Sequence, residues 1–196
     1  MLDHVFTDAI GAMSDAMVGA MLERQAFEER FQVDVLLGDV TWETSYGLPG
    51  EGQPPRVRAD ITLDWPTWAQ TAYRSWYIGE PFEEPPEVIV EISLRIQRLI
   101  DRPDPEMVLA VLPDASPLIG TEALERSAPT IEEVLGFGQT EYAFEVSFEG
   151  SVPLEEEALA DGSILDQRFG VLGGWVASTL VKLGDLKLQH LPAEED

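Results

Sequence analysis

The chain has 196 residues, enough for one fair-sized domain, and its 44% hydrophobic content allows a sizeable core. It carries 37 acidic and 12 basic residues, a net charge of -25, and it contains no cysteine. The charge disfavours direct binding to nucleic acids and anionic membranes, and the absence of cysteine excludes disulfides, thiolate catalysis and cysteine-based zinc sites.

The N-terminal segment, residues 3–29, is predicted to form an amphipathic helix with Asp3 as its N-cap. It has neither the basic start of a secretory signal nor an unbroken apolar run that could span a membrane. We therefore expect an intracellular or virion location. The apolar side chains that recur at helical spacing are Phe6, Ala9, Ile10, Met13, Met17, Ala20, Met21 and Phe27.

A β region follows this helix. Apolar residues occupy odd positions in 31–37 and even positions in 40–46, and the change of phase at Gly38 predicts a bulge or a tight turn. Residues 57–65 alternate strictly between apolar and polar side chains, which is typical of a half-buried strand.

Residues 66–78 are ambiguous. Pro66 favours the start of a helix in which Trp68 and Trp76 share a face. The aromatic and threonine content instead favours a strand, above all over Tyr73–Ile78. We expect a strand at that end of the segment.

The segment EVIVEISLRIQRL, residues 87–99, is the longest clear strand of the sequence, with one apolar and one polar face. Its length exceeds that of a usual strand and indicates that it extends beyond its own core towards a neighbour. The preceding segment GEPFEEPPE is rich in proline and glutamate, so we expect a loop that protects a sheet edge.

Short helices and strands alternate in the next part of the chain. Asp104 and Pro105 have the pattern of a helix start, and Thr130 and Glu133 have the spacing of a capping box. The expected elements are a helix over 107–112, a strand over 121–126, a helix over 130–136 and a strand over 142–148.

A long helix is expected near the C-terminus, where Ser163 and Asp166 have capping-box spacing. Gly170, Gly173 and Gly174 lie inside it, and close backbone packing is the expected reason for these glycines. A short strand over 186–191 and an acidic tail over 192–196 end the chain. The apolar stripe of the helix consists of Leu165, Phe169, Leu172, Val176 and Leu180.

These elements predict one α+β domain over residues 1–196. A mainly antiparallel sheet would carry the N-terminal and C-terminal helices on one face.

Motifs for known chemistry are weak in this sequence. It has no nucleophile elbow, no phosphate-binding glycine loop and no H-E-x-x-H zinc motif, and its two histidines, His4 and His190, lie near opposite ends. The spacing of Asp101, Asp104 and Glu106 does not fit a calcium loop. We expect no catalytic residue, no metal site and no cofactor.

Aromatic residues concentrate between positions 42 and 77, where they would form part of the core or a subunit contact. A ligand-stacking platform is the alternative. The candidate interface residues are Trp42, Trp65, Trp68, Tyr73, Trp76, Tyr77, Arg95 and Arg98.

The acidity has three candidate causes: adaptation to high salt, a basic protein partner, or mimicry of DNA. Ten of the twelve basic residues are arginine, which fits a halophilic or high-GC host.

The order of the expected elements resembles that of tail-terminator and tail-completion proteins of tailed phages. It begins with an amphipathic helix and a meander of long one-sided strands, and the strand YAFEVSFEG and the late helix SILDQRFGVLGGWVASTLVKL follow later. The resemblance implies a ring that caps the tail tube and meets the head connector. It includes no specific motif, so it assigns no functional residues.

The preferred hypothesis is therefore a non-catalytic assembly protein that forms homo-oligomers, with a ring in a virion neck or tail as its specific form. The first alternative is an acidic binding module or inhibitor that engages a basic protein. The second is an enzyme that uses carboxylates or a bound cation.

Overall fold

The computed structural model describes residues 4–21, 27–36, 38–48, 54–81, 83–136 and 139–192. Side chains are described for the same residues except 20–21, 27–36, 136 and 139. Asp3, the expected N-cap of the first helix, and residues 193–196 of the acidic tail lie outside the described part.

Seven antiparallel strands form one sheet in the described chain. The first four strands form a meander, β7 pairs with β4, and β5 and β6 both pair with the other side of β7. The strands are β1 (Phe27–Leu36), β2 (Asp39–Gly47), β3 (Val57–Trp65), β4 (Glu87–Leu99), β5 (Glu125–Arg126), β6 (Thr130–Gly136) and β7 (Gln139–Pro153).

One face of this sheet is apolar because side chains alternate between the two faces of each strand. Every second residue of β3 is buried from Val57 to Trp65, and β4 follows the same pattern from Val88 to Ile96. The register sets the buried residues side by side: Ile92 lies opposite Ile61 on one side and Phe148 on the other.

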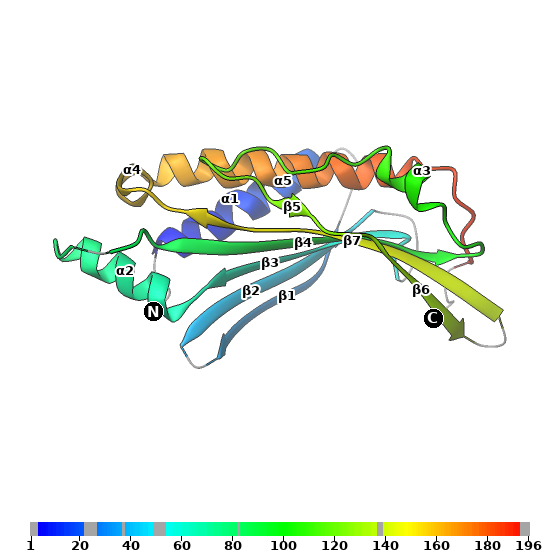
Figure 1. Ribbon diagram of the computed structural model, residues 1–196, viewed down its shortest axis with the longest axis horizontal. Coiled ribbons are helices and arrows are strands. Elements are labelled where there is room, and N and C mark those ends of the chain that lie inside the picture. The colour runs from blue at the N-terminus through cyan, green and yellow to red at the C-terminus, as the bar shows by residue number, and fades with distance from the viewer. Residues whose placement is uncertain are drawn as a thin grey trace.

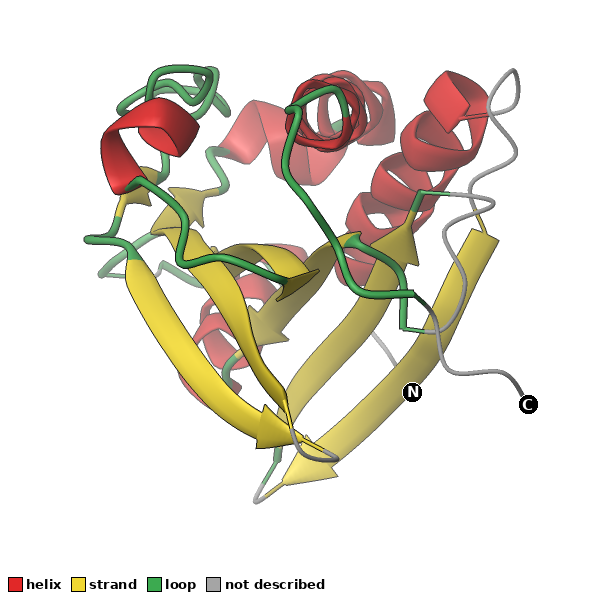
Figure 2. Cartoon of the chain, turned by 90° about the vertical axis from the view of Figure 1, so that its right-hand side faces the viewer, coloured by secondary structure: helices red, strands yellow, loops and turns green. Residues whose placement is uncertain are grey.

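Helices α1 (His4–Met21) and α5 (Gly162–Gly184) cover this apolar face, and the sheet curves around them (Figures 1 and 2). The rings of Phe6 and Trp65 stack with centroids 6.0 Å apart, and Trp175 meets Phe148 edge-on at 4.9 Å. This arrangement confirms the α+β class with both terminal helices on one face. The shorter helices are α2 (Thr67–Tyr77), α3 (Pro105–Leu109) and α4 (Glu156–Ala160).

Two predictions in the first half of the chain are wrong. The first helix does not reach residue 29, because β1 already begins at Phe27. The strand expected over Tyr73–Ile78 is the second half of helix α2. Its buried side chains include Ala69 and Tyr73, which pack towards the core.

Two predictions in the second half are also wrong. Residues 130–136 form strand β6 and not a helix, because they pair with β7 from Thr130 to Gly136. Residues 186–191 form no strand, although the backbone of 189–191 hydrogen-bonds to Arg98 and Ile100 at the end of β4.

Several local signals are confirmed or corrected in detail. Leu36 pairs with Asp39, so the phase change at Gly38 marks the tight turn of a hairpin. Asp104 caps α3 by accepting a hydrogen bond from the Glu106 N–H. Helix α5 is capped by Asp161 and not by Ser163.

The position of β4 corrects the expectation for residues 79–99. The strand lies between β3 and β7 and is paired with both of them along most of its length. Its length therefore serves the core of this chain. The loop before it leads into a central strand, so it does not protect a sheet edge.

Candidate interaction surfaces

The eight candidate interface residues divide into a buried and an exposed group. Trp42, Trp65, Tyr73 and Arg98 are buried within the chain, and Trp76 is partly buried against the core. The four aromatic residues contribute to the hydrophobic core of this chain, and the buried Arg98 lies near the end of β4. Trp68, Tyr77 and Arg95 remain at the surface.

Helix α2 and the residue that follows it carry exposed apolar side chains. The side chains of Trp68, Tyr77 and Ile78 are 45%, 69% and 66% exposed. Trp68 lies in the first turn and Tyr77 ends the helix, so at 3.6 residues per turn their side chains project from opposite sides of α2. They are therefore separate exposed residues and do not form one continuous patch.

The position of α2 depends on contacts from distant parts of the chain. The Asp39 carboxylate accepts hydrogen bonds from the N–H and the hydroxyl of Thr67, at 2.6 and 2.7 Å. These bonds lower the pKa of Asp39. The buried Gln70 amide donates to the backbone oxygens of Gly38 and Trp65, at 2.7 and 2.9 Å. Helix α2 is therefore fixed at its first turn.

The β6–β7 hairpin also carries exposed apolar side chains. Val134 is 41% exposed and Leu135 is 84% exposed, although both lie in a strand. Because neighbouring residues of a strand point to opposite faces, Val134 lies on the same face as Glu141, its partner on β7, whereas Leu135 and Glu133 lie on the other face. The two apolar side chains therefore do not form one patch.

Sequence reasoning missed the exposed Val134 and Leu135 because it assigned residues 130–136 to a helix. The segment Glu132-Glu133-Val134-Leu135 does not alternate between polar and apolar residues. The period of two that identifies a half-buried strand was therefore absent. The exposed Ile78, which caps the C-terminal end of α2, was missed for a similar reason, since the segment was expected to be a strand.

Arg95 fixes β6 to the centre of the sheet. Its guanidinium donates to Glu145 of β7 at 2.7 Å and to Glu132 of β6 at 2.5 Å. Both carboxylates lie on the sheet face opposite α1 and α5, which no described helix covers. We call this the open face.

A row of carboxylates crosses the open face. The strand register places Glu43, Thr62, Glu91, Glu149 and Glu125 next to one another on five strands. Burial and the negative charges of Glu149, Asp64 and Glu145 raise the pKa of Glu91. The centre of the open face therefore concentrates negative charge. Like charges directly opposite one another on a sheet repel, so this arrangement is unfavourable.

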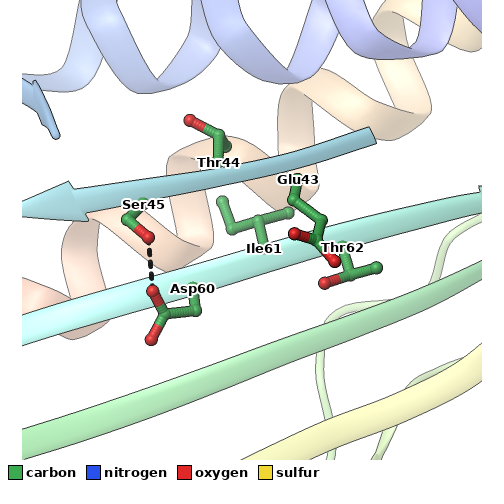
Figure 3. A pocket seen from close by; sticks show the side chains of 6 residues that line it. All are labelled: Glu43, Thr44, Ser45, Asp60, Ile61 and Thr62. Carbon is green, nitrogen blue, oxygen red and sulfur yellow. Dashed lines mark hydrogen bonds between the residues drawn. The ribbon is translucent and has the colours of Figure 1, made fainter. Parts of the chain in front are cut away.

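A hollow of about 230 Å³ lies between β2 and β3. Figure 3 shows Glu43 beside Thr62 on its polar side and a hydrogen bond from the Ser45 hydroxyl to Asp60. Thr44 and Ile61 complete the lining, and both are buried. Its polar groups are neighbouring side chains on two paired strands.

A second hollow, of about 530 Å³, lies between the outer sides of α1 and α5. Asp8, Asp15 and Asp166 surround it, and Gly11 and Gly170 form part of its wall. Among the described residues, no three histidine, aspartate or glutamate side chains converge as a metal ion would require. None of the described helices is both long and apolar enough to cross a membrane.

Comparison with protein-family models, with curated proteins and with solved structures finds no match to this chain.

Proposed function

We propose that the chain is a non-catalytic structural or assembly protein that works through oligomeric contacts with other protein subunits. The observation that carries this proposal is the exposure of large apolar side chains on two separate elements, α2 and the β6–β7 hairpin. Exposed apolar residues that gather on a few elements, and are not scattered singly over the surface, are typical of proteins that bind other proteins.

The test is the mass of the protein in solution. Sedimentation equilibrium across a wide concentration range, in low salt and in about 1 M KCl, should show species larger than the 21.7 kDa chain. High salt should promote association, because it screens the repulsion between copies that each carry a charge of -25. A mass of 21.7 kDa under every condition would refute the proposal.

A component of a virion neck or tail is the specific form of this proposal. The resemblance to tail-terminator proteins supports it, because the order α1, meander, α3, β7 and α5 is the order on which that resemblance rests. Negative-stain electron microscopy of the purified oligomer tests this form directly. Closed rings of uniform diameter would support it, whereas open filaments or compact dimers would contradict it.

An acidic binding module is the second candidate, and the carboxylate row of the open face favours it. A basic segment bound over Glu91 and Glu149 would relieve the repulsion between them. An arginine-rich peptide should then bind at about 50 mM salt and dissociate at about 500 mM, as measured by calorimetry.

The variant Glu91→Gln/Glu149→Gln should weaken binding of that peptide markedly. The matched control is Glu156→Gln/Glu157→Gln on α4, which removes the same charge at a distance from the row. Equal weakening by both variants would show that the peptide responds to total charge and not to the open face.

A further inference from the structure

Strand β1 forms one edge of the sheet. It runs over ten residues, Phe27–Leu36, and pairs with β2 on one side, whereas no strand of the described chain pairs with its other side. Figure 1 shows β1 at the outer margin of the fan of strands. An edge strand presents a row of backbone N–H and C=O groups that can pair with a strand of another molecule.

Most features that protect edge strands are missing from β1. Protected edges are usually very short, or they carry proline, lysine or a bulge. β1 is long and contains no proline, glycine or lysine. Its irregularity lies near the start, where the register with β2 skips Glu29, and residues 30–36 pair without interruption. The regular part of this edge is therefore suited to pairing with another strand.

We propose that β1 of one copy pairs antiparallel with β1 of a second copy, about a two-fold axis at Gln32, so that two sheets join into one. A two-fold contact uses the same surface on both copies and closes, so its product is a dimer. This inference rests on the proposed function in its general form, because a ring would need a further contact between such dimers.

The charges of β1 are self-complementary in this register. In an antiparallel pair centred on Gln32, Arg30 of each copy stands directly opposite Asp34 of the other, which gives two pairs of opposite charge. Arg30 and Asp34 are the register partners of Ser45 and Thr41 in β2, so both belong to the open face of the sheet. Opposite charges at directly opposed positions of a sheet stabilise the pairing.

The apolar residues of β1 match in the same register. Phe31 of each copy stands opposite Val33 of the other, and these residues are the register partners of the buried Thr44 and Trp42. A two-fold axis perpendicular to the sheet keeps each face on its own side. The joined sheet would therefore have one continuous apolar face, with the helices of both copies on that side.

Other registers of the same pair fit less well. A shift by one residue in the centre keeps the faces matched but changes the opposed charges. Centring on Val33 separates Arg30 from Asp34, and centring on Phe31 brings Asp34 towards Glu28 of the other copy. Only the register centred on Gln32 forms both charge pairs.

The other side of the sheet is a poorer partner. Strand β6, which pairs with β7 there, contains Glu132 and Glu133 and no base, so two copies of β6 would present only negative charge to one another. β1 itself holds three acids and one base, so a mixed contact between β1 and β6 would bring two acidic strands together. Like charges across a contact are costly, which favours β1 with β1.

A single cysteine tests the pairing directly. The chain contains no cysteine, so an introduced thiol is unique. Residue 32 stands opposite itself in the proposed dimer, and directly opposed residues have Cα atoms about 4.5–5.5 Å apart, which a disulfide can span. Gln32→Cys should therefore form a covalent dimer on mild oxidation, as seen on a non-reducing gel. Thr71→Cys, on the exposed side of α2, is the control and should stay largely monomeric.

Charge reversal gives an independent test. Arg30→Asp and Asp34→Arg each place like charges opposite one another twice, so each should weaken dimerisation at least about tenfold in sedimentation experiments. An equimolar mixture of the two variants should restore it, because every opposed pair then joins an aspartate to an arginine. The double variant Arg30→Asp/Asp34→Arg should also dimerise like the parent chain.

Two control variants make the same changes of net charge outside β1. Lys187→Asp and Glu157→Arg lie at exposed positions after α5 and on α4, so each should change dimerisation much less than its counterpart in β1. Circular dichroism verifies that every variant is folded.

The outcomes separate this inference from the proposed function. If the parent chain oligomerises but Gln32→Cys cross-links no better than Thr71→Cys, or the charge-reversed mixture shows no recovery, pairing through β1 is refuted and the proposed function stands. Cross-linking of Val33→Cys in place of Gln32→Cys would overturn the register. If the parent chain is monomeric under every condition, both the inference and the proposed function fail.

Discussion

Gly173 of α5 packs so closely against α1 that a Cβ atom built on it would lie 2.9 Å from the Cβ of Ala16 and 2.9 Å from the backbone oxygen of Met13. Gly174, the next residue, has no such neighbour within 4 Å. The expectation that close packing explains the helix glycines is therefore confirmed at Gly173, whereas Gly174 and Gly170 have open space.

This difference predicts opposite effects from the same substitution. Gly173→Ala should lower the free energy of unfolding by about 1–3 kcal/mol, because the methyl group must separate two packed helices. Gly174→Ala should raise it by up to about 1 kcal/mol, because alanine favours a helix over glycine. Urea denaturation of both variants measures the two changes. Equal effects would show that the helices do not approach at Gly173.

The pKa shift of Glu91 predicts a stability that depends on pH. Burial and neighbouring carboxylates hold this pKa above its ordinary value of 4.5, so ionisation of Glu91 destabilises the folded chain. Glu91→Gln should therefore raise the free energy of unfolding at pH 7. The gain should shrink as pH falls through the raised pKa and vanish below about 4.5, in chemical denaturation at a series of pH values.

Glu155 is the matched control, because its pKa is shifted in the opposite direction to that of Glu91. Burial is the largest single influence on its pKa and raises it, but hydrogen bonds and the charge of Arg168, 2.6 Å away, together lower it. Glu155→Gln should lower stability at pH 7, and this loss should disappear as pH falls through the lowered pKa of Glu155. Parallel pH profiles for the two variants would contradict the assignment of either shift.

The total charge predicts a response to salt. Each folded chain confines a charge of -25 in one compact volume, so screening should stabilise it against unfolding. The melting temperature should rise steeply between about 0.02 and 0.5 M KCl, and NaCl should act equally. A melting temperature that does not change with salt concentration would argue against charge repulsion as an important influence on stability. It would also argue against adaptation to high salt.

The strands were predictable where each buries one face. The bounds expected for β3 and β4, 57–65 and 87–99, agree with the structure at both ends. Their alternation is a local property, and antiparallel pairing with one solvated face makes it visible in the sequence. The alternating core of β7 was found for the same reason, although the strand extends beyond the expected 142–148.

The failures have tertiary causes. The Thr130–Glu133 spacing of a capping box occurs inside a strand, where pairing with β7 and the bond from Arg95 to Glu132 outweigh the local preference. The interface prediction failed to separate Trp65, in the core, from Trp68, at the surface, because composition does not show that Trp65 ends β3 on its buried face and that Trp68 begins α2 on its exposed side.

The helix α2 shows the same limit and offers a direct test. Its first turn depends on groups about thirty residues earlier: Asp39 binds Thr67, and Gly38 accepts from the Gln70 amide. Gln70→Met keeps the side chain long but removes the amide that donates to the backbone oxygens of Gly38 and Trp65. The free energy of unfolding should fall by about 1–3 kcal/mol, or about 0.5–1.5 kcal/mol for each lost hydrogen bond.

The control for Gln70→Met is Thr71→Ala, one residue further along on the exposed side of α2, which should change stability by less than about 0.5 kcal/mol. Hydrogen exchange adds local information. In Gln70→Met the amides of α2 should exchange faster than those of β4, because the helix loses contacts that fix it to the turn at Gly38. If both variants retain the stability of the parent chain, the Gln70 hydrogen bonds contribute little and packing of Tyr73 alone holds the helix.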